Sequence, residues 1–284
     1  MRPAPFSYHK AAGLDQALAM LAEFGDEARP LAGGQSLVPM MNLRLARPSH
    51  LIDINDLGLD MIEERGHVVH LGALVRHERY AQDPVIARHF PAFAEGVDWI
   101  GHPTIRRRGT LGGSIAHADP TAELPALCVL HDATIIAQSC AGTRHIPAAD
   151  FFVSAYVTSL EPGEMVTGVD LPIPPRPTSG AFEEFAERRG DFAMITVGVI
   201  LHHDQGRITD AAITWSGIEL APVRAGAEIL RGRSLADPDA AGAARIMAAE
   251  ITPLDDPIAS AAFRKDLIIE LTQRALTRAC EKAI

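Results

Sequence analysis

A glycine-rich stretch within residues 101–126 constrains the fold more than any other part of the chain. Its centre, residues 109–114, reads GTLGGS, so that glycines and hydroxyl-bearing residues surround a single leucine. Glycine lets the backbone adopt positive φ and approach a ligand closely, and successive N–H groups can then surround an anion. The stretch is therefore predicted to be a phosphate-binding turn.

An upstream stretch has the same pattern. Residues 31–37 read LAGGQSL, with an apolar entry, paired glycines, a polar residue, a serine and an apolar continuation. The surrounding periodicity predicts a strand, the glycine turn, a helix and a second strand, and the helix start beside Gln35 and Ser36 favours an anion. The GxGxxG spacing of a Rossmann fingerprint is missing. Together, the two turns predict a site for one diphosphate.

Composition narrows the class of protein. The chain has 284 residues, of which 47% are hydrophobic and 22% charged, as is typical of soluble globular proteins. The net charge of -10 argues against a nucleic-acid partner, because binding a phosphate backbone needs a strongly basic face. The chain lacks an apolar run of about 18 residues that would predict a membrane span, and its N-terminus lacks the apolar segment of a secretory signal. A cytoplasmic location is expected.

Residues that usually bind metals or carry out catalysis are sparse and scattered. The chain has three cysteines, which are Cys128, Cys140 and Cys280. Their spacing excludes a self-contained cysteine-ligated iron–sulfur cluster and a disulfide framework. The pairs His67 with His70 and His202 with His203 would point to opposite faces of a strand, which argues against a metal site. Hydrolase and nucleotide-triphosphatase motifs are missing, so the residues identify no catalytic group and no metal ligand.

Turn and breaker signals divide the chain into three units. Residues 56–58 predict a boundary, and the proline-rich residues 172–180 predict a linker. Residues 1–56 and 57–175 are predicted to form two small subdomains, and residues 176–284 a C-terminal α+β domain. In that domain we expect three antiparallel strands and several helices, namely strands over residues 182–187, 195–202 and 208–215, and helices over residues 225–230, 238–251 and 260–282.

The two turns and the residues after the second resemble the FAD-binding medium subunit of the molybdenum hydroxylases, of the carbon monoxide dehydrogenase type. The resemblance is carried by AGGQS at residues 32–36, TLGGS at 110–114, HADP at 117–120 and ELP at 123–125, and it extends along almost the whole chain. It implies the vanillyl-alcohol-oxidase-like flavoprotein fold, an α+β architecture. In that fold, the two α/β subdomains enclose FAD and precede the C-terminal domain.

The resemblance also implies a set of cofactor contacts. The residues expected to bind FAD are Ala32, Gly33, Gly34, Gln35, Ser36, Leu37, Thr110, Leu111, Gly112, Gly113, Ser114, His117, Asp119, Glu123 and Phe192. Backbone N–H groups, helped by the hydroxyls of Ser36, Thr110 and Ser114, are expected to donate hydrogen bonds to the pyrophosphate. The flavin carries the redox chemistry itself, so no catalytic side chain is expected.

Several of these residues also have structural interpretations. Glu123 stands where the family often has an aspartate that reaches the ribityl chain or neighbouring groups, but a carboxylate there also favours a helix start. Asp119 is a contact or a helix cap, and His117 is a contact or a loop histidine. Phe192 covers the isoalloxazine ring and controls the approach of the electron acceptor, or it is a core aromatic residue at the start of a strand.

Two charged positions depart from the family pattern. Residues 106–108 read RRR where the family commonly has Arg-Asn-Arg. This run places a guanidinium near the phosphates, or it is a solvated surface charge. Glu184 stands where many relatives carry lysine, so we do not expect a cation there to tune the flavin.

By resemblance, the chain is one subunit of a complex. Its partners would be a large molybdenum-cofactor subunit and a small subunit with 2Fe–2S clusters, in a dimer of heterotrimers. The chain would hold FAD without a covalent bond and pass electrons from the iron–sulfur subunit to an external acceptor, while another polypeptide selects the substrate. Two alternatives stay open, namely a free-standing FAD-dependent oxidase or dehydrogenase with its own substrate pocket, and a flavin-free scaffold.

Overall fold

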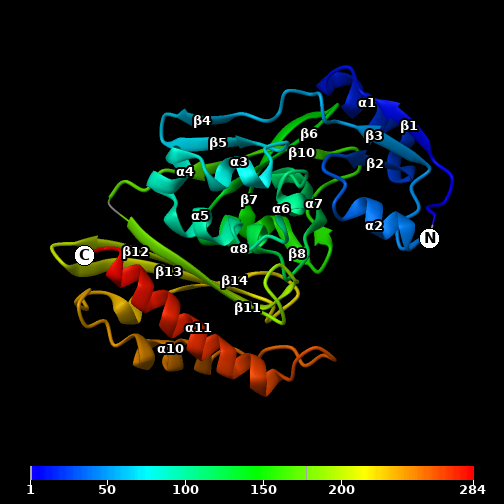
Figure 1. The fold of residues 1–284 in the computed structure, drawn as a ribbon. Coiled ribbons are helices and arrows are strands. Elements are labelled where there is room, and N and C mark those ends of the chain that lie inside the picture. Colours follow the sequence, from blue (N-terminus) through cyan, green and yellow to red (C-terminus); the bar gives the residue numbers. More distant parts are fainter. Residues whose placement is uncertain (1, 177) are drawn as a thin grey trace.

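The computed structural model of the chain describes residues 2–176 and 178–284. Within these residues the strands form three larger sheets that follow one another along the chain, and one short two-stranded sheet. Figure 1 shows the N-terminal sheet at one end, the second sheet along the top, and the C-terminal sheet with its long helix below. Short helices from the middle of the chain lie between the second and the C-terminal sheets.

The N-terminal sheet is parallel, with the strand order β1-β3-β2. Its elements are β1 (Ser7–Lys10), α1 (Leu14–Phe24), a 3-10 turn (Gly25–Glu27), β2 (Ala28–Leu31), α2 (Leu37–Asn42) and β3 (His50–Asp53). Helix α1 forms because Leu14, Leu18 and Leu21 recur at helical spacing and pack against the core around Ile52. The predicted strand, helix and strand around the first turn are confirmed. Strand β1 was not predicted, because its side chains are exposed or half-buried and show no apolar alternation.

The second sheet is antiparallel, with the strand order β4-β5-β10-β6-β7. Its strands are β4 (Ile62–Arg65), β5 (Val68–Gly72), β6 (Thr134–Ser139), β7 (Gly142–Pro147) and β10 (Met165–Pro172). Strands β4 and β5 form a hairpin, with Gly66 at φ 63° in its turn. The short strands β8 (Phe152–Ser154) and β9 (Val157–Thr158) pair with each other.

Short helices between β5 and β6 cover the second sheet. They are α3 (His77–Ala81), α4 (Pro84–His89), α5 (Pro91–Val97), α6 (Pro103–Arg106), α7 (Leu111–His117) and α8 (Glu123–Leu130), and α9 (Ala148–Phe151) follows β7. Every residue of α8 is buried, because this helix lies between α5 and strands β12 and β13 of the C-terminal sheet. Its side chain Leu127 shares one core cluster with Phe90 and Phe93.

The C-terminal sheet has four strands, in the order β11-β12-β13-β14, rather than the three that were predicted. Its elements are β11 (Thr178–Ala186), β12 (Ala193–Asp204), β13 (Arg207–Ser216), β14 (Val223–Gly226), a 3-10 turn (Glu228–Leu230), α10 (Ala240–Ala249) and α11 (Ala261–Glu281). The predicted helix over residues 225–230 is wrong at its start, where β14 pairs with β13, and only Glu228–Leu230 is helical, as a 3-10 turn. The predicted linker over residues 172–180 is shorter in the structure, because β10 extends to Pro172 and β11 begins at Thr178. Pro177, within this linker, lies outside the described residues.

The two faces of the C-terminal sheet pack against different partners. Val197 and Val199 of β12 share a core cluster with residues of α10 and α11. The alternate positions of the sheet, such as Phe182 and Ile200, join the cluster that contains α5 and α8. This second face therefore places its side chains opposite the helix that begins at Glu123. Among the described residues, no helix has the length and the apolar character needed to cross a membrane.

Candidate functional site

The structure brings the two glycine turns into direct contact. A Cβ atom at Gly33 would lie 2.1 Å from the carbonyl oxygen of Arg108 and 2.9 Å from the Cα of Gly109. Backbone atoms cannot move aside as a flexible side chain can, so position 33 requires glycine. The first turn thus lies against the residues that open the second.

The first turn offers a row of unpaired donors. Gly34 adopts φ 69°, a conformation that favours glycine, and α2 begins at Leu37. The N–H groups of residues 33–37 donate to no protein acceptor within residues 2–176 and 178–284, whereas the next one, at Val38, donates to the carbonyl of Gly34 at 3.1 Å. The Gln35 side chain donates to the carbonyl of Gly33 at 2.9 Å, which holds the turn in shape. Such a row of free N–H groups suits an anion.

The second turn is built differently. Most of it is the helix α7, whose N-terminal cap is Thr110, and the expectation of positive φ at its glycines is wrong. Gly112 N–H donates to the carbonyl of Ala73 at 2.8 Å, and Gly113 N–H donates to the Thr110 hydroxyl at 3.2 Å. A Cβ at Gly112 would lie 2.5 Å from that of Ala73, so glycine is needed there for close packing.

A few polar groups of the second turn stay available to a ligand. Within the described ranges, the Thr110 N–H and the Ser114 hydroxyl take part in no hydrogen bond. Leu111 is fully buried and its N–H donates to the carbonyl of Val75 at 3.0 Å, so this residue serves the core.

The arginine run before the second turn has structural partners. Arg106 donates from Nη1 to the carbonyl oxygens of Ile100 and Gly101, at 3.0 and 2.8 Å. Arg107 is exposed and pairs with Glu78 at 3.4 Å. These partners favour the structural interpretation of Arg106 and the surface-charge interpretation of Arg107.

Residues after α7 form a polar group around Asp119. Its Oδ1 accepts hydrogen bonds from the N–H of Thr121 at 2.9 Å and from the Thr121 hydroxyl at 2.7 Å. Its Oδ2 accepts one from the Tyr156 hydroxyl at 3.2 Å, and the Tyr156 ring lies 5.1 Å from that of His117. Burial lowers the pKa of His117, so its imidazole is neutral near pH 7. Asp119 therefore orders this segment, with oxygens directed at Thr121 and Tyr156.

Tyr156 was not predicted as a site residue. It lies in the turn between β8 and β9 at φ 60°, a conformation that non-glycine residues rarely adopt. Its N–H donates to the carbonyl of Ala118 at 2.8 Å, which secures the turn against the end of α7. A positive φ at a tyrosine leaves no signal in the sequence.

Two buried carboxyl groups, one on α8 and one on β11, influence each other electrostatically. Glu123 is the first residue of α8, and burial raises its pKa, with the charge of Asp119 adding to the effect. Glu184 on β11 is only 6% exposed, and burial followed by the charge of Glu123 raises its pKa. Neither Glu184 oxygen has a hydrogen-bond partner in the described part of the chain. Two such neighbours disfavour double ionisation, so Glu184 is a neutral acid near pH 7.

Phe192 is 75% exposed, so the interpretation as a core aromatic residue is wrong. It lies in the loop between β11 and β12. That loop is held in place because Gly190, at φ 91°, packs against His102, and the guanidinium of Arg189 lies 5.3 Å from the Trp99 ring centroid. The exposed phenyl ring thus stands on a loop fixed against the segment that leads into the second turn.

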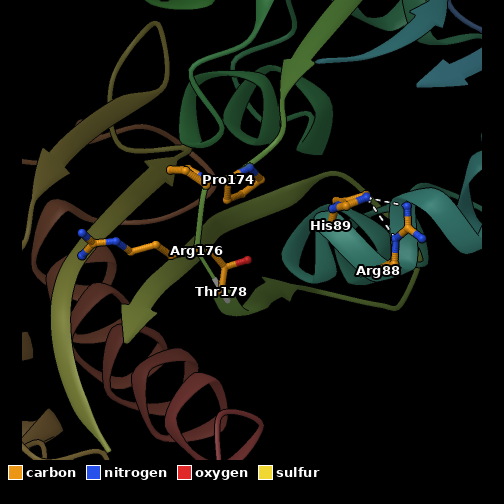
Figure 2. A pocket seen from close by; sticks show the side chains of 6 residues that line it. Arg88, His89, Pro174, Arg176 and Thr178 are labelled. Carbon is orange, nitrogen blue, oxygen red and sulfur yellow. Dashed lines mark hydrogen bonds between the residues drawn. The ribbon is translucent and has the colours of Figure 1, made fainter. Parts of the chain in front are cut away.

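One recess lies away from the turns. Figure 2 shows it between α4 and the start of β11, with Arg176 pointing away from Arg88 and His89. Its volume is about 250 Å³, and it is lined by Arg88, His89, Pro174, Pro175, Arg176 and Thr178. Arg88 and His89 already bind Glu64, so this recess adds no ligand site. Within the described residues, groups of His, Cys, Asp and Glu large enough to hold a metal ion are missing.

Comparison with known families covers nearly the whole chain. Residues 4–174 match the family described as the FAD binding domain in molybdopterin dehydrogenase, and residues 180–279 match the CO dehydrogenase flavoprotein C-terminal domain. The chain belongs to the FAD-binding medium subunits of this family.

Relatives of this medium subunit match it over nearly their full length. It is 38% identical to the 6-hydroxypseudooxynicotine dehydrogenase complex subunit alpha of Paenarthrobacter nicotinovorans, covering 100% of this chain and 97% of the relative. It is 34% identical to the carbon monoxide dehydrogenase medium chain of Afipia carboxidovorans, covering 100% and 99%. Among solved structures, quinoline 2-oxidoreductase from Pseudomonas putida 86 superposes with a TM-score of 0.94 at 35% identity, covering 100% and 99%.

The residues of this medium subunit fit FAD at the two turns. A diphosphate carries negative charge and many acceptor oxygens, and residues 33–37 present N–H donors that are paired with none of the described residues. When bound, FAD supplies reversible transfer of electrons, which the side chains around the turns do not provide.

Proposed function

We propose that this medium subunit binds FAD non-covalently between the two glycine turns and passes electrons from an iron–sulfur partner to an external acceptor. The observation that carries the proposal is the row of N–H groups in residues 33–37, which have no acceptor among the described residues and pack against the start of the second turn. These donors stabilise the pyrophosphate, and the Ser36, Thr110 and Ser114 hydroxyls complete its coordination. Matching of residues 4–174 to a FAD-binding domain supports this assignment.

The remaining predicted residues take roles around this diphosphate site. His117, Asp119 and Glu123 follow the second turn and lie on the path from the pyrophosphate toward the flavin ring. Phe192 stands exposed on a loop fixed beside this segment, and it controls how closely an electron acceptor approaches the ring. The protein therefore binds and orients the cofactor, and its loop regulates access.

The chain acts within a larger complex. Its relatives are named as a complex subunit alpha and a medium chain, which supports a similar arrangement here. A large subunit supplies the molybdenum cofactor and a small subunit supplies the 2Fe–2S clusters, in a cytoplasmic dimer of heterotrimers. We assign the fold to the vanillyl-alcohol-oxidase-like flavoproteins, with subdomains over residues 1–56 and 57–175 and a C-terminal domain over residues 176–284. The three larger sheets support this division, since one sheet lies in each unit.

Titration of the purified full chain with FAD tests the cofactor assignment. We expect the flavin fluorescence to be quenched at one FAD per chain, and acid precipitation to release the flavin intact because the bond is non-covalent. A chain that rejects FAD would be the flavin-free scaffold instead.

Purification from the native source tests the subunit role. We expect the chain to co-purify with two partners. One is larger and contains molybdenum, and the other is smaller and contains iron. A lone flavoprotein that its substrate reduces directly would overturn this role and identify a free-standing oxidase or dehydrogenase.

A further inference from the structure

Two side chains outside the glycine turns connect one turn to the other. Arg76 lies just before α3 and forms an isolated β-bridge with Thr110. Its Nη1 donates to the carbonyl oxygen of Arg108, immediately before the second turn. Its Nη2 donates to Oδ1 of Asn55 at 2.7 Å.

Asn55 reaches the first turn. It follows β3, which runs parallel to β2, so it lies at the strand ends where the first turn begins. Its Nδ2 donates to the carbonyl oxygens of Leu31 and Ala32, at 3.2 and 3.1 Å, and to Oδ1 of Asp53 at 2.7 Å. These acceptors fix the orientation of the amide, because a flipped amide would direct its oxygen at three other oxygens.

The result is an uninterrupted bridge from the carbonyls of the first turn, through Asn55 and Arg76, to the carbonyl of Arg108. That same carbonyl is the atom against which Gly33 packs. A guanidinium suits the position because its planar fork donates directional hydrogen bonds to two acceptors at once. Arg106 and Arg107, by contrast, bind carbonyls before α6 and a surface carboxylate.

We propose that Asn55 and Arg76 are positioning residues, which hold the two turns at the separation that a diphosphate requires. The proposal rests on the proposed function, since it needs FAD to bind at both turns. Its consequence is that the two residues act as one unit. Removing either one releases the bridge, and removing the second as well adds little.

Fluorescence titration of the full chain with FAD tests the bridge through the Arg76→Met and Asn55→Ala variants and their double variant. We expect Arg76→Met to weaken FAD binding by about 10- to 100-fold, the range for a hydrogen bond to a charged group. The double variant should bind within about 3-fold of the weaker single variant, because the losses are coupled. Arg76→Lys, which keeps one of the two hydrogen bonds, should restore part of the affinity.

Arg107→Met is the matched control, because it removes a neighbouring guanidinium that touches neither turn, and it should bind FAD like the wild type. If Arg76→Met binds FAD as tightly as the wild type, or if the two single losses multiply in the double variant, the positioning role is overturned. If Arg76→Met does not fold, Arg76→Lys and Asn55→Ala decide by the same criteria, with thermal unfolding confirming that they are folded. A wild-type chain that rejects FAD would overturn the proposed function itself.

Discussion

The two glycine turns share a sequence pattern but use their glycines differently. In the first turn, Gly34 adopts φ 69° and the N–H groups of residues 33–37 have no acceptor in the described ranges. In the second, Gly109 and Gly112 leave room for His77 and Ala73, and the N–H of Gly112 is already bound. The difference indicates that the first turn offers more free donors to a ligand, while the glycines of the second turn mainly allow close packing and support the first turn.

The strongest test of this comparison is Gly33→Ala, because position 33 is where the turns meet. The added Cβ would lie 2.1 Å from the carbonyl oxygen of Arg108, so the turns must separate. We expect FAD affinity to fall by at least about 100-fold, since several backbone hydrogen bonds to the diphosphate are lost together. Titration with FAD measures the loss.

Gly13→Ala is the control for this test. Position 13 has open space around the same added atom and an extended backbone at φ -172°, so FAD binding should be unchanged. Equal affinity of the Gly33→Ala and wild-type chains would show that the turns do not need to touch.

The second test compares stability with binding in the supporting turn. In Gly112→Ala, the new Cβ would lie 2.5 Å from that of Ala73, so the helix α7 is overpacked. We expect the free energy of unfolding to fall by about 1–3 kcal/mol, with a smaller loss of FAD affinity than in Gly33→Ala. Chemical denaturation and FAD titration measure the two quantities. A Gly112→Ala chain of normal stability that fails to bind FAD would reverse the roles assigned to the two turns.

The sequence located both turns but could not show their different roles. Glycine is required both where φ is positive and where close packing leaves no room for a Cβ atom. Only the residues that surround it in the fold show which of the two reasons holds. For Gly112 the neighbour is Ala73, which precedes it by many residues and approaches only in the fold. The local elements around the first turn were predictable, because periodicity and paired breakers are local signals.

Other features depended on tertiary contacts that no local pattern contains. Strand β14 is too short to alternate visibly, and it exists because β13 offers an unpaired edge. Asn55 becomes a bridge residue only because β2 and β3 end side by side. Glu184 could be recognised as a departure from the family, but its burial opposite α8 follows from the packing of the sheet.

The carboxyl pair of Glu123 and Glu184 allows the comparison to be tested by pH. Glu123 follows the second turn along the chain, so the pair is associated with that turn and not with the donors of the first. The folded state holds Glu184 neutral with a raised pKa, whereas the unfolded chain ionises near the usual value of about 4.3. The unfolded state therefore loses its proton first, and the free energy of unfolding falls as pH rises from that value toward the raised pKa. Thermal or chemical unfolding across this range measures the slope.

Glu184→Gln sharpens this test, because an amide keeps the shape but does not ionise. We expect the variant to match the wild type at acidic pH and to exceed its stability by about 1 kcal/mol or more at alkaline pH. Glu123 and the charged groups that act on it, Asp119 and Arg106, remain in the variant. Parallel pH profiles for the two chains would mean that Glu184 is ionised in the fold.

The smallest effect on binding is expected at Phe192, which lies outside both turns. Its side chain is 75% exposed, so Phe192→Ala should change the free energy of unfolding by no more than about 0.5 kcal/mol and leave FAD affinity unchanged. Reoxidation of the chemically reduced flavin by an artificial acceptor dye should nevertheless change in rate if the phenyl ring has the proposed role of controlling how closely the acceptor approaches. Stopped-flow absorbance measures this rate, and Phe185→Ala, an exposed aromatic on β11 that packs on Phe263, serves as the control. If FAD affinity falls together with the change in rate, Phe192 is a binding residue. The contacts to the cofactor would then extend beyond the two turns and the segment after the second.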